Sequence, residues 1–153
     1  MSTPETGEDD LQVVEAPYGS ALYCRALAVR ESILRAPLGL PLTEEEQADH
    51  ALRQHFCATS HGAVVGSVSL KPTDRDSLQL RQMAVAEDRW RERIGARLLA
   101  HAEHWARGEG YRLMVLNARL GAEGFYARFG YFAQGEPFDE NTLPHIRMTK
   151  LLA

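Results

Sequence analysis

The chain has 153 residues, 44% of them hydrophobic and 25% charged, which is the composition of an ordinary globular protein with one sizeable core. Its formal net charge of −4 reflects the first ten residues, which hold four of the 21 acidic side chains and leave 17 acidic against 17 basic residues. This balance excludes the basic footprint of a protein that binds nucleic acid or an anionic membrane. We expect a disordered acidic tail at 1–10 and a single domain at 11–153.

The sequence indicates no membrane or export segment. No apolar run approaches the roughly 20 residues that cross a bilayer, and "MSTPETGEDD" lacks the basic-then-apolar order of a signal peptide. Cys24 and Cys57 stand outside any CxxC or His pairing, so we expect two buried thiols and neither a disulfide framework nor a metal site. These features favour a cytoplasmic protein.

The first fifty residues are predicted to form a strand and two helices. A strand is expected at 11–16, a helix at 19–35, and a break at 36–42, where Pro and Gly recur. Thr43 is a helix N-cap before a second short helix at 44–52, which has acidic residues in its first turn. One apolar face of the first helix is formed by Leu22, Ala26, Val29 and Ile33.

The middle of the chain is predicted to be a three-stranded antiparallel meander. The runs at 53–60 and 63–70 are rich in β-forming residues and are separated by the tight turn "HG". After a loop at 71–76, a third strand is expected at 77–85.

The period then changes to that of a helix. Ile94, Leu98, Ala102 and Trp105 form one helical stripe that ends at "GEG". The following strand at 111–117 is continuously apolar, as expected for a strand covered on both faces. Strand, helix and strand in this order predict a parallel pair with a right-handed crossover. Two closing strands are expected at 131–134 and 145–152.

Arginines crowd the start of the helix at 94, in "DRWRERIGAR". Cations oppose the helix macrodipole at an N-terminus, and a sequence tolerates them where an anion normally binds. The pattern favours a phosphate ligand, with a solvated basic patch as the alternative.

The segment "NARLGAEGFYARFGY" at 117–131 is predicted to hold a short helix. Phe125 and Phe129 lie four residues apart on one face, and Gly130 ends the helix. Tyr126 points away from that face. It is either a half-buried packing residue with a solvated hydroxyl or a functional group.

The stretch from "LRQMAV" through "RWRERIGARLL" to "VLNA", followed by "GFYARFGY", resembles the core of the GCN5-related N-acetyltransferases, the GNAT family. The resemblance covers about residues 20–152, and its C-terminal part is similar to an uncharacterised bacterial subgroup. The family's pyrophosphate motif, Gln/Arg-x-x-Gly-x-Gly/Ala, ends here at Gly95. Trp90 replaces the usual first residue, and Arg93 replaces the first glycine.

The resemblance implies an α/β (α+β) fold: a mixed, mostly antiparallel sheet of six to seven strands with about four helices. The strands ending "QMAV" and "VLN" would splay apart around the pantetheine arm of acetyl-CoA. Tyr126 would protonate the leaving thiolate, for which its ordinary pKa of about 10 is suited. The residues implied in binding acetyl-CoA are Met83, Ala84 and Val85 for the arm, Arg91, Arg93, Ile94, Gly95 and Ala96 for the pyrophosphate, and Asn117 and Tyr126 on the other side.

The general base is poorly marked in this sequence. Family members often carry a Glu on the third meander strand, where this chain has Arg81 and Gln82. His145 and Glu136 are the candidates, and proton removal through water is an equal alternative.

We therefore expect direct transfer of the acetyl group to an amine of a small molecule or a peptide, with no covalent intermediate, because neither cysteine lies in the motifs. The alternatives are a non-catalytic acetyl-CoA-binding sensor on the same fold and, more weakly, a nucleotide-binding α/β protein. In this family the acceptor is set by the first helices and by loops, here around 36–50 and 135–144. Homodimers are common in the family.

Overall fold

The computed structural model describes residues 11–32, 43–86 and 93–152. The expected tail at 1–10, the break at 36–42, and the motif positions Trp90 and Arg91 lie outside these ranges. The chain divides into two compact units, one from Met1–Lys71 and Gln82–Ala102, the other from Pro72–Arg81 and Glu103–Ala153. A single domain at 11–153 stays a prediction.

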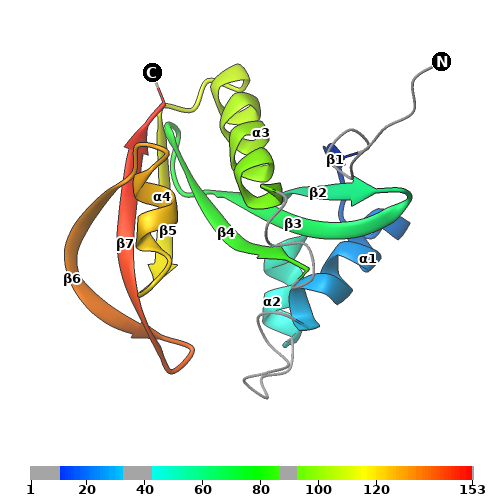
Figure 1. Cartoon of the computed structure of the whole chain (residues 1–153), viewed down its shortest axis with the longest axis horizontal. Helices are drawn as coiled ribbons and strands as arrows, with labels where there is room; N and C mark the ends of the chain where they lie inside the picture. Colours follow the sequence, from blue (N-terminus) through cyan, green and yellow to red (C-terminus); the bar gives the residue numbers. More distant parts are fainter. Residues whose placement is uncertain (1–10, 33–42, 87–92, 153) are drawn as a thin grey trace. The chain divides into compact units, whose positions relative to one another are not determined.

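Seven strands form one mixed sheet in the order β1-β2-β3-β4-β5-β7-β6 (Figure 1). The pair β4–β5 is parallel, and the pairs β1–β2, β2–β3, β5–β7 and β6–β7 are antiparallel. With four helices in the described part of the chain, this confirms the predicted fold class. The strands are β1 (Gln12–Glu15), β2 (Gln54–Ser60), β3 (Ala63–Pro72), β4 (Ser77–Val85), β5 (Leu113–Arg119), β6 (Phe132–Glu140) and β7 (Leu143–Leu151). The helices are α1 (Ala21–Arg30), α2 (Glu44–His50), α3 (Ile94–Gly108) and α4 (Glu123–Ala127).

Local signals explain the boundaries of the first unit. The Thr43 side chain accepts a hydrogen bond from the backbone of Glu46, whose carboxylate returns to the Thr43 backbone, so α2 begins with the predicted cap. The turn between β2 and β3 has positive φ at both His61 (51°) and Gly62 (81°), as a two-residue hairpin requires. None of the helices in the described ranges is long and apolar enough to span a bilayer.

The buried face of α1 differs from the predicted apolar stripe. Its buried residues are Tyr23, Ala26 and Arg30, whereas Leu22 and Val29 are only partly buried. The predicted stripe is confirmed in part, since Ala26 lies in the core with Leu22 packed against it, while Ile33 lies outside the described residues. The pattern did not show that Arg30 is buried, because hydrophobic periodicity places an arginine in solvent, and here Gln82 accompanies Arg30 into the interior.

The two cysteines also differ from each other. Cys57 is fully buried, as predicted, and burial raises the pKa of its thiol. Cys24 is exposed on α1, so the prediction that it is buried was wrong. It lies beside the buried position Tyr23, on the solvent side of the same helix turn.

In the second unit, β5 is the central strand. It pairs in parallel with β4 from Ser77↔Leu113 to Leu80↔Leu116, and antiparallel with β7 along its whole length. This double pairing explains its continuous apolar run and confirms the predicted parallel pair.

The strand β6 is longer than the sequence pattern indicated. It continues through Gly135 to Glu140, with a shift of register between Gln134 and Phe138. Gly135 has a φ of 76°, which lets the strand bulge and resume its pairing with β7. The expected loop at 135–144 is therefore mostly strand, and only Asn141 and Thr142 form the turn.

Candidate functional site

The strand β4 is distorted at Gln82, which has a φ of 54° in the middle of the strand. Such a conformation costs about 1–3 kcal/mol for a residue with a side chain. The side-chain oxygen of Gln82 accepts hydrogen bonds from Arg53 Nη1 (2.9 Å) and from Arg30 Nη1 (3.4 Å). These two guanidinium groups hold the distortion in place.

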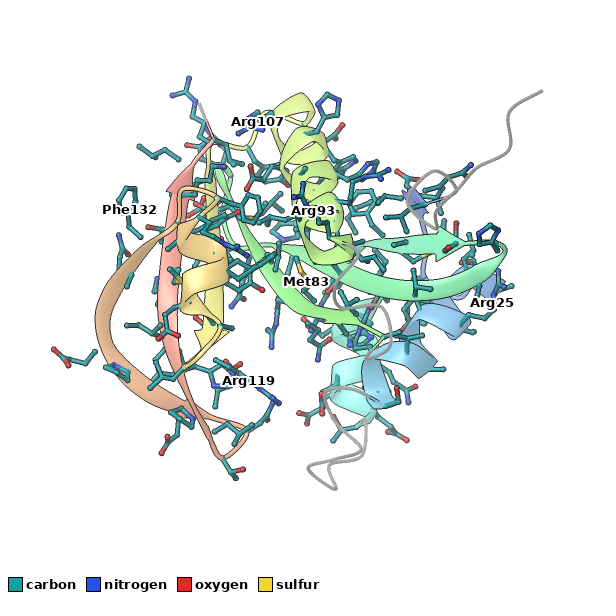
Figure 2. The ribbon with its side chains drawn as sticks, in the orientation of Figure 1. Arg25, Met83, Arg93, Arg107, Arg119 and Phe132 are labelled. Carbon is teal, nitrogen blue, oxygen red and sulfur yellow. The ribbon has the colours of Figure 1, made fainter. Side chains whose placement is uncertain are left out.

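The three residues that follow are the predicted arm-binding positions. Ala84 is buried, and Met83 (labelled in Figure 2) and Val85 are partly buried. The backbone N–H of Ala86 donates to the carbonyl of Val65 at 2.9 Å, which ties the end of β4 to β3. Met83–Val85 thus lies between the Gln82 distortion and a fixed strand end.

The start of α3 carries the predicted pyrophosphate motif. Arg93 is exposed and has a φ of 59°, the left-handed conformation that glycine adopts without cost. Its carbonyl accepts the hydrogen bond of Arg97 N–H at 3.0 Å and so opens the helix. Arginine therefore stands at the motif's first-glycine position in a conformation that suits glycine, and this costs about 1–2 kcal/mol for a residue with a side chain. The N–H groups of Ile94, Gly95 and Ala96 belong to the first turn, where a helix offers them no internal partner.

A glycine on β3 positions that helix start. A Cβ atom on Gly66 would lie 3.0 Å from Ile94 Cγ2 and 3.1 Å from both the Ala84 carbonyl oxygen and Leu98 Cδ1. Ile94 and Leu98 are fully buried. The absent side chain lets α3 pack directly on β3. The sequence pattern did not predict this role, although Gly66 is the single glycine within the apolar run 63–70.

In the second unit, Tyr126 lies on α4 among aromatic rings. It is half-buried and meets Phe125 and Tyr131 edge to face, with centroid distances of 5.0 and 5.9 Å. Burial raises the pKa of Tyr126 to about 12, above the ordinary value of 10.0 that we had expected. The hydroxyl therefore keeps its proton at any physiological pH. Phe125 and Phe129 share one face, as predicted, with centroids 5.2 Å apart.

The structure brings Asn117 and His145 together through Glu140. Asn117 Nδ2 donates to Glu140 Oε1 at 3.1 Å, and Glu140 Oε2 lies 3.6 Å from His145 Nε2. His145 Nδ1 lies 2.8 Å from the Leu143 carbonyl oxygen. Because a carbonyl only accepts, Nδ1 carries hydrogen, and Nε2 is the ring nitrogen that faces Glu140. Glu136, the other predicted base, is exposed on β6.

A buried polar cluster in the first unit was not anticipated from the sequence. Arg53 Nε donates to Asp49 Oδ2 at 2.9 Å, and Lys71 Nζ lies 2.6 Å from Asp49 Oδ1. Burial alone would raise the pKa of Asp49, but the hydrogen bonds from Lys71 and Arg53 outweigh it and hold that pKa at about 2. The signal for this cluster was Arg30, which stands four residues after Ala26 on the inner face of α1.

Two histidines adjoin that cluster. The Tyr23 hydroxyl lies 2.9 Å from His50 Nδ1, and His55 Nε2 donates to the His50 carbonyl at 2.7 Å. Burial first, and the neighbouring arginines in smaller part, lower the pKa of each histidine to about 4. Within 11–32, 43–86 and 93–152, no three His, Cys, Asp or Glu side chains converge as metal ligands.

Comparison with known proteins gives consistent matches. The model of the acetyltransferase (GNAT) family matches residues 22–131. The uncharacterized N-acetyltransferase YitI from Bacillus subtilis (strain 168) is 31% identical over 132 residues, which are 81% of this chain and 88% of that protein. A candidate N-acetyltransferase from Lactobacillus plantarum has a similar structure, with a TM-score of 0.83 at 21% identity over 94% of this chain and 99% of that one. A GNAT family acetyltransferase from Elizabethkingia anophelis, solved with acetyl-CoA bound, gives a TM-score of 0.74 at 18% identity over the same shares of the two chains.

Proposed function

This chain belongs to the GNAT acetyltransferase family, and from that membership we propose that it transfers the acetyl group of acetyl-CoA directly to an amine nitrogen of a small molecule or a peptide. The observation that carries the proposal is Arg93. It stands where the family's motif has a glycine, and its φ of 59° is a left-handed conformation that glycine adopts without cost, which supports a role for this segment as the pyrophosphate loop.

We assign the binding of acetyl-CoA to backbone groups near the two irregular backbone positions. Met83, Ala84 and Val85 would bind the pantetheine arm, since they directly follow the left-handed Gln82, where the regular geometry of β4 is interrupted. The first-turn N–H groups of α3, together with the side chains of Arg91 and Arg93, would bind the pyrophosphate. Asn117 would contact the arm on its other side.

The proposed reaction has one chemical step. The amine nitrogen attacks the thioester carbonyl, the new C–N bond forms, and the C–S bond breaks. The Tyr126 hydroxyl gives its proton to the departing sulfur, and the amine proton goes to His145 Nε2 or through water to solvent. Burial raises the pKa of this phenol to about 12, so the hydroxyl is protonated at neutral pH when the sulfur departs.

Direct transfer, rather than an acetyl-enzyme, is favoured by the state of the cysteines. Cys57 is fully buried, and burial raises the pKa of its thiol, which disfavours the reactive thiolate. Cys24 lies on α1, outside every motif position.

The test is a thiol-release assay over a broad amine panel, with mass spectrometry of the acetylated product and a parallel titration of acetyl-CoA binding. We expect release that depends on the amine, together with an N-acetylated product. Tight binding without turnover on any amine would instead establish the acetyl-CoA sensor. Stoichiometric acetylation of the protein by acetyl-CoA alone would establish a covalent route.

A further inference from the structure

Arg30, the last residue of α1, is fully buried with part of its guanidinium unsatisfied. Its Nη1 donates to Gln82, but Nε and Nη2 have no hydrogen-bond partner among the residues that the structure describes. Buried polar groups are normally paired, so two unpaired donors on one buried cation call for an explanation.

The two unpaired atoms form a specific recognition edge. The N–H bonds of Nε and of the outer nitrogen Nη2 run parallel on one side of a guanidinium group. This is the edge that binds a carboxylate through two hydrogen bonds at once. The edge that faces Gln82 is a different one, so both contacts can exist together.

Within the described residues, the negative charge near Arg30 offsets its buried positive charge only in part. Burial lowers the pKa of its guanidinium to about 10, the like charge of Arg53 lowers it further, and Tyr23 and Glu31 raise it by smaller amounts. The carboxylate of Asp49 is already bound by Arg53 and Lys71. An added anion would compensate a buried positive charge that the protein itself compensates only in part.

The position of this edge relates it to the proposed reaction. The Nη1 atom of Arg30 contacts the side chain of Gln82, and Gln82 immediately precedes Met83–Val85, where we place the arm of acetyl-CoA. An anionic group bound to Arg30 would therefore lie close to the strand segment that presents the thioester. During transfer the acceptor amine has to meet the thioester at this segment, so an anionic group of the acceptor is a candidate partner for this edge.

We propose that Arg30 binds a carboxylate of the acceptor through Nε and Nη2, and that the substrates of this enzyme are amines carrying a carboxylate, such as amino acids. This inference rests on the proposed function and narrows its acceptor class. In this proposal Arg30 binds the acceptor, and the hydrogen bond to Gln82 positions the Arg30 guanidinium.

Matched acids and amides test the proposal. The thiol-release assay compares kcat/KM for each acid with kcat/KM for its amide. The pairs are alanine and alaninamide, then other amino acids and ω-amino acids, each with its own amide. The wild-type enzyme is expected to prefer the acid of at least one pair by about 10-fold to 100-fold, the effect of two charge-assisted hydrogen bonds. In Arg30→Met the ratio of kcat/KM for the acid to kcat/KM for the amide should fall to about one; because the ratio is taken within one variant, a general loss of activity from the lost Gln82 contact cancels.

Arg25→Met is the control variant. Arg25, labelled in Figure 2, lies on the same helix, but it is exposed and donates to the Gly62 carbonyl. This variant should keep the wild-type preference. A wild-type enzyme that treats acids and amides alike overturns the proposal, even if Arg30→Met fails to fold. A preference that survives in folded Arg30→Met overturns it as well.

Product analogues separate this inference from the proposed function. If no amine is acetylated, the proposed function fails, and calorimetry with N-acetylalanine and N-acetylalaninamide decides the inference. Binding of the acid alone supports a carboxylate site at Arg30, and equal binding or no binding of the two overturns it.

Discussion

The rings of Tyr126 and Tyr131 meet edge to face, with centroids 5.9 Å apart and planes at 72°. The Tyr131 hydroxyl donates to buried Glu103 at 2.9 Å, and Lys150 Nζ lies 2.7 Å from the same carboxylate. Burial first, and then Glu103, raise the pKa of Tyr131 far above its ordinary value. Tyr126, the proposed general acid, therefore packs against Tyr131, which Glu103 and Lys150 hold in place.

Tyr131→Phe is expected to reduce stability. The change keeps the ring against Tyr126 but removes a hydrogen bond to a buried carboxylate, a bond that contributes about 1.5–3 kcal/mol. The free energy of unfolding, measured by urea titration at pH 7, should fall by that amount. An unchanged value would mean that Lys150 and Arg107 satisfy Glu103 without the tyrosine.

Stability should depend on pH through His50 and His55. Their folded pKa of about 4 lies below the ordinary value of 6.5, so the unfolded chain binds more protons between these values. Their contribution is therefore fully present above pH 6.5 and is lost as the pH falls toward 4. Asp49 has a folded pKa of about 2 against an ordinary value of 3.8, so its contribution to stability is lost only as the pH falls from 3.8 toward 2.

Urea titrations between pH 4 and 7 measure this dependence. The free energy of unfolding should decrease steadily as the pH falls, and His55→Phe should flatten the slope, because one of the two titrating groups is gone. A wild-type stability that stays constant from pH 7 to pH 4 would contradict the burial of neutral histidines.

Arg93→Ala and Arg93→Gly separate the side chain of Arg93 from its backbone. Both variants lose a charge next to the proposed pyrophosphate, so both should raise the dissociation constant of acetyl-CoA about five-fold or more. Glycine adopts a φ of 59° freely and alanine does not, so the glycine variant should be more stable by about 1 kcal/mol. Calorimetry gives the affinities, and urea titration gives the stabilities. An unchanged affinity in both variants would restore the solvated basic patch as the explanation of these arginines.

Gly66→Ala tests how α3 is placed. A Cβ atom 3.0 Å from Ile94 would force the helix start away from β3, which costs about 1–3 kcal/mol. Acetyl-CoA should also bind more weakly, because the first turn of α3 moves. The control is Gly108→Ala at the end of α3, where a Cβ atom meets nothing within 4 Å and where we expect stability to stay nearly unchanged. If both variants were equally stable, the close packing at Gly66 would not be what positions the helix.

Much of the fold could be predicted because the pattern of neighbouring residues indicates each of these elements. The runs at 53–60, 63–70 and 77–85 became β2, β3 and β4 almost residue for residue, and the Thr43 cap fixed the start of α2. The helical spacing of apolar residues from Ile94 onward predicted α3. In each case the hydrophobic period or a cap is a property of neighbouring residues, which a sequence displays directly.

The remaining features depend on partners distant in sequence or on backbone angles. A buried Arg30 is hidden from hydrophobic patterning, since its partner Gln82 lies 52 residues away. The left-handed backbone of Arg93 cannot be predicted from the residue type, because arginine rarely adopts that conformation. The link from Asn117 to His145 needed Glu140, which the sequence placed in a loop and the structure places at the end of a bulged strand.

A single-turnover measurement of Tyr126→Phe tests most directly whether Tyr126 supplies the proton in a direct acetyl transfer. The variant keeps the ring and its edge contacts, with Tyr18→Phe in the first unit as the control. With saturating amine and acetyl-CoA, the rate of acetyl transfer should fall about a hundred-fold or more, while the acetyl-CoA dissociation constant stays within about two-fold. A rate near that of the wild type, with chemistry shown to limit turnover, would contradict the account and leave Tyr126 as a packing residue.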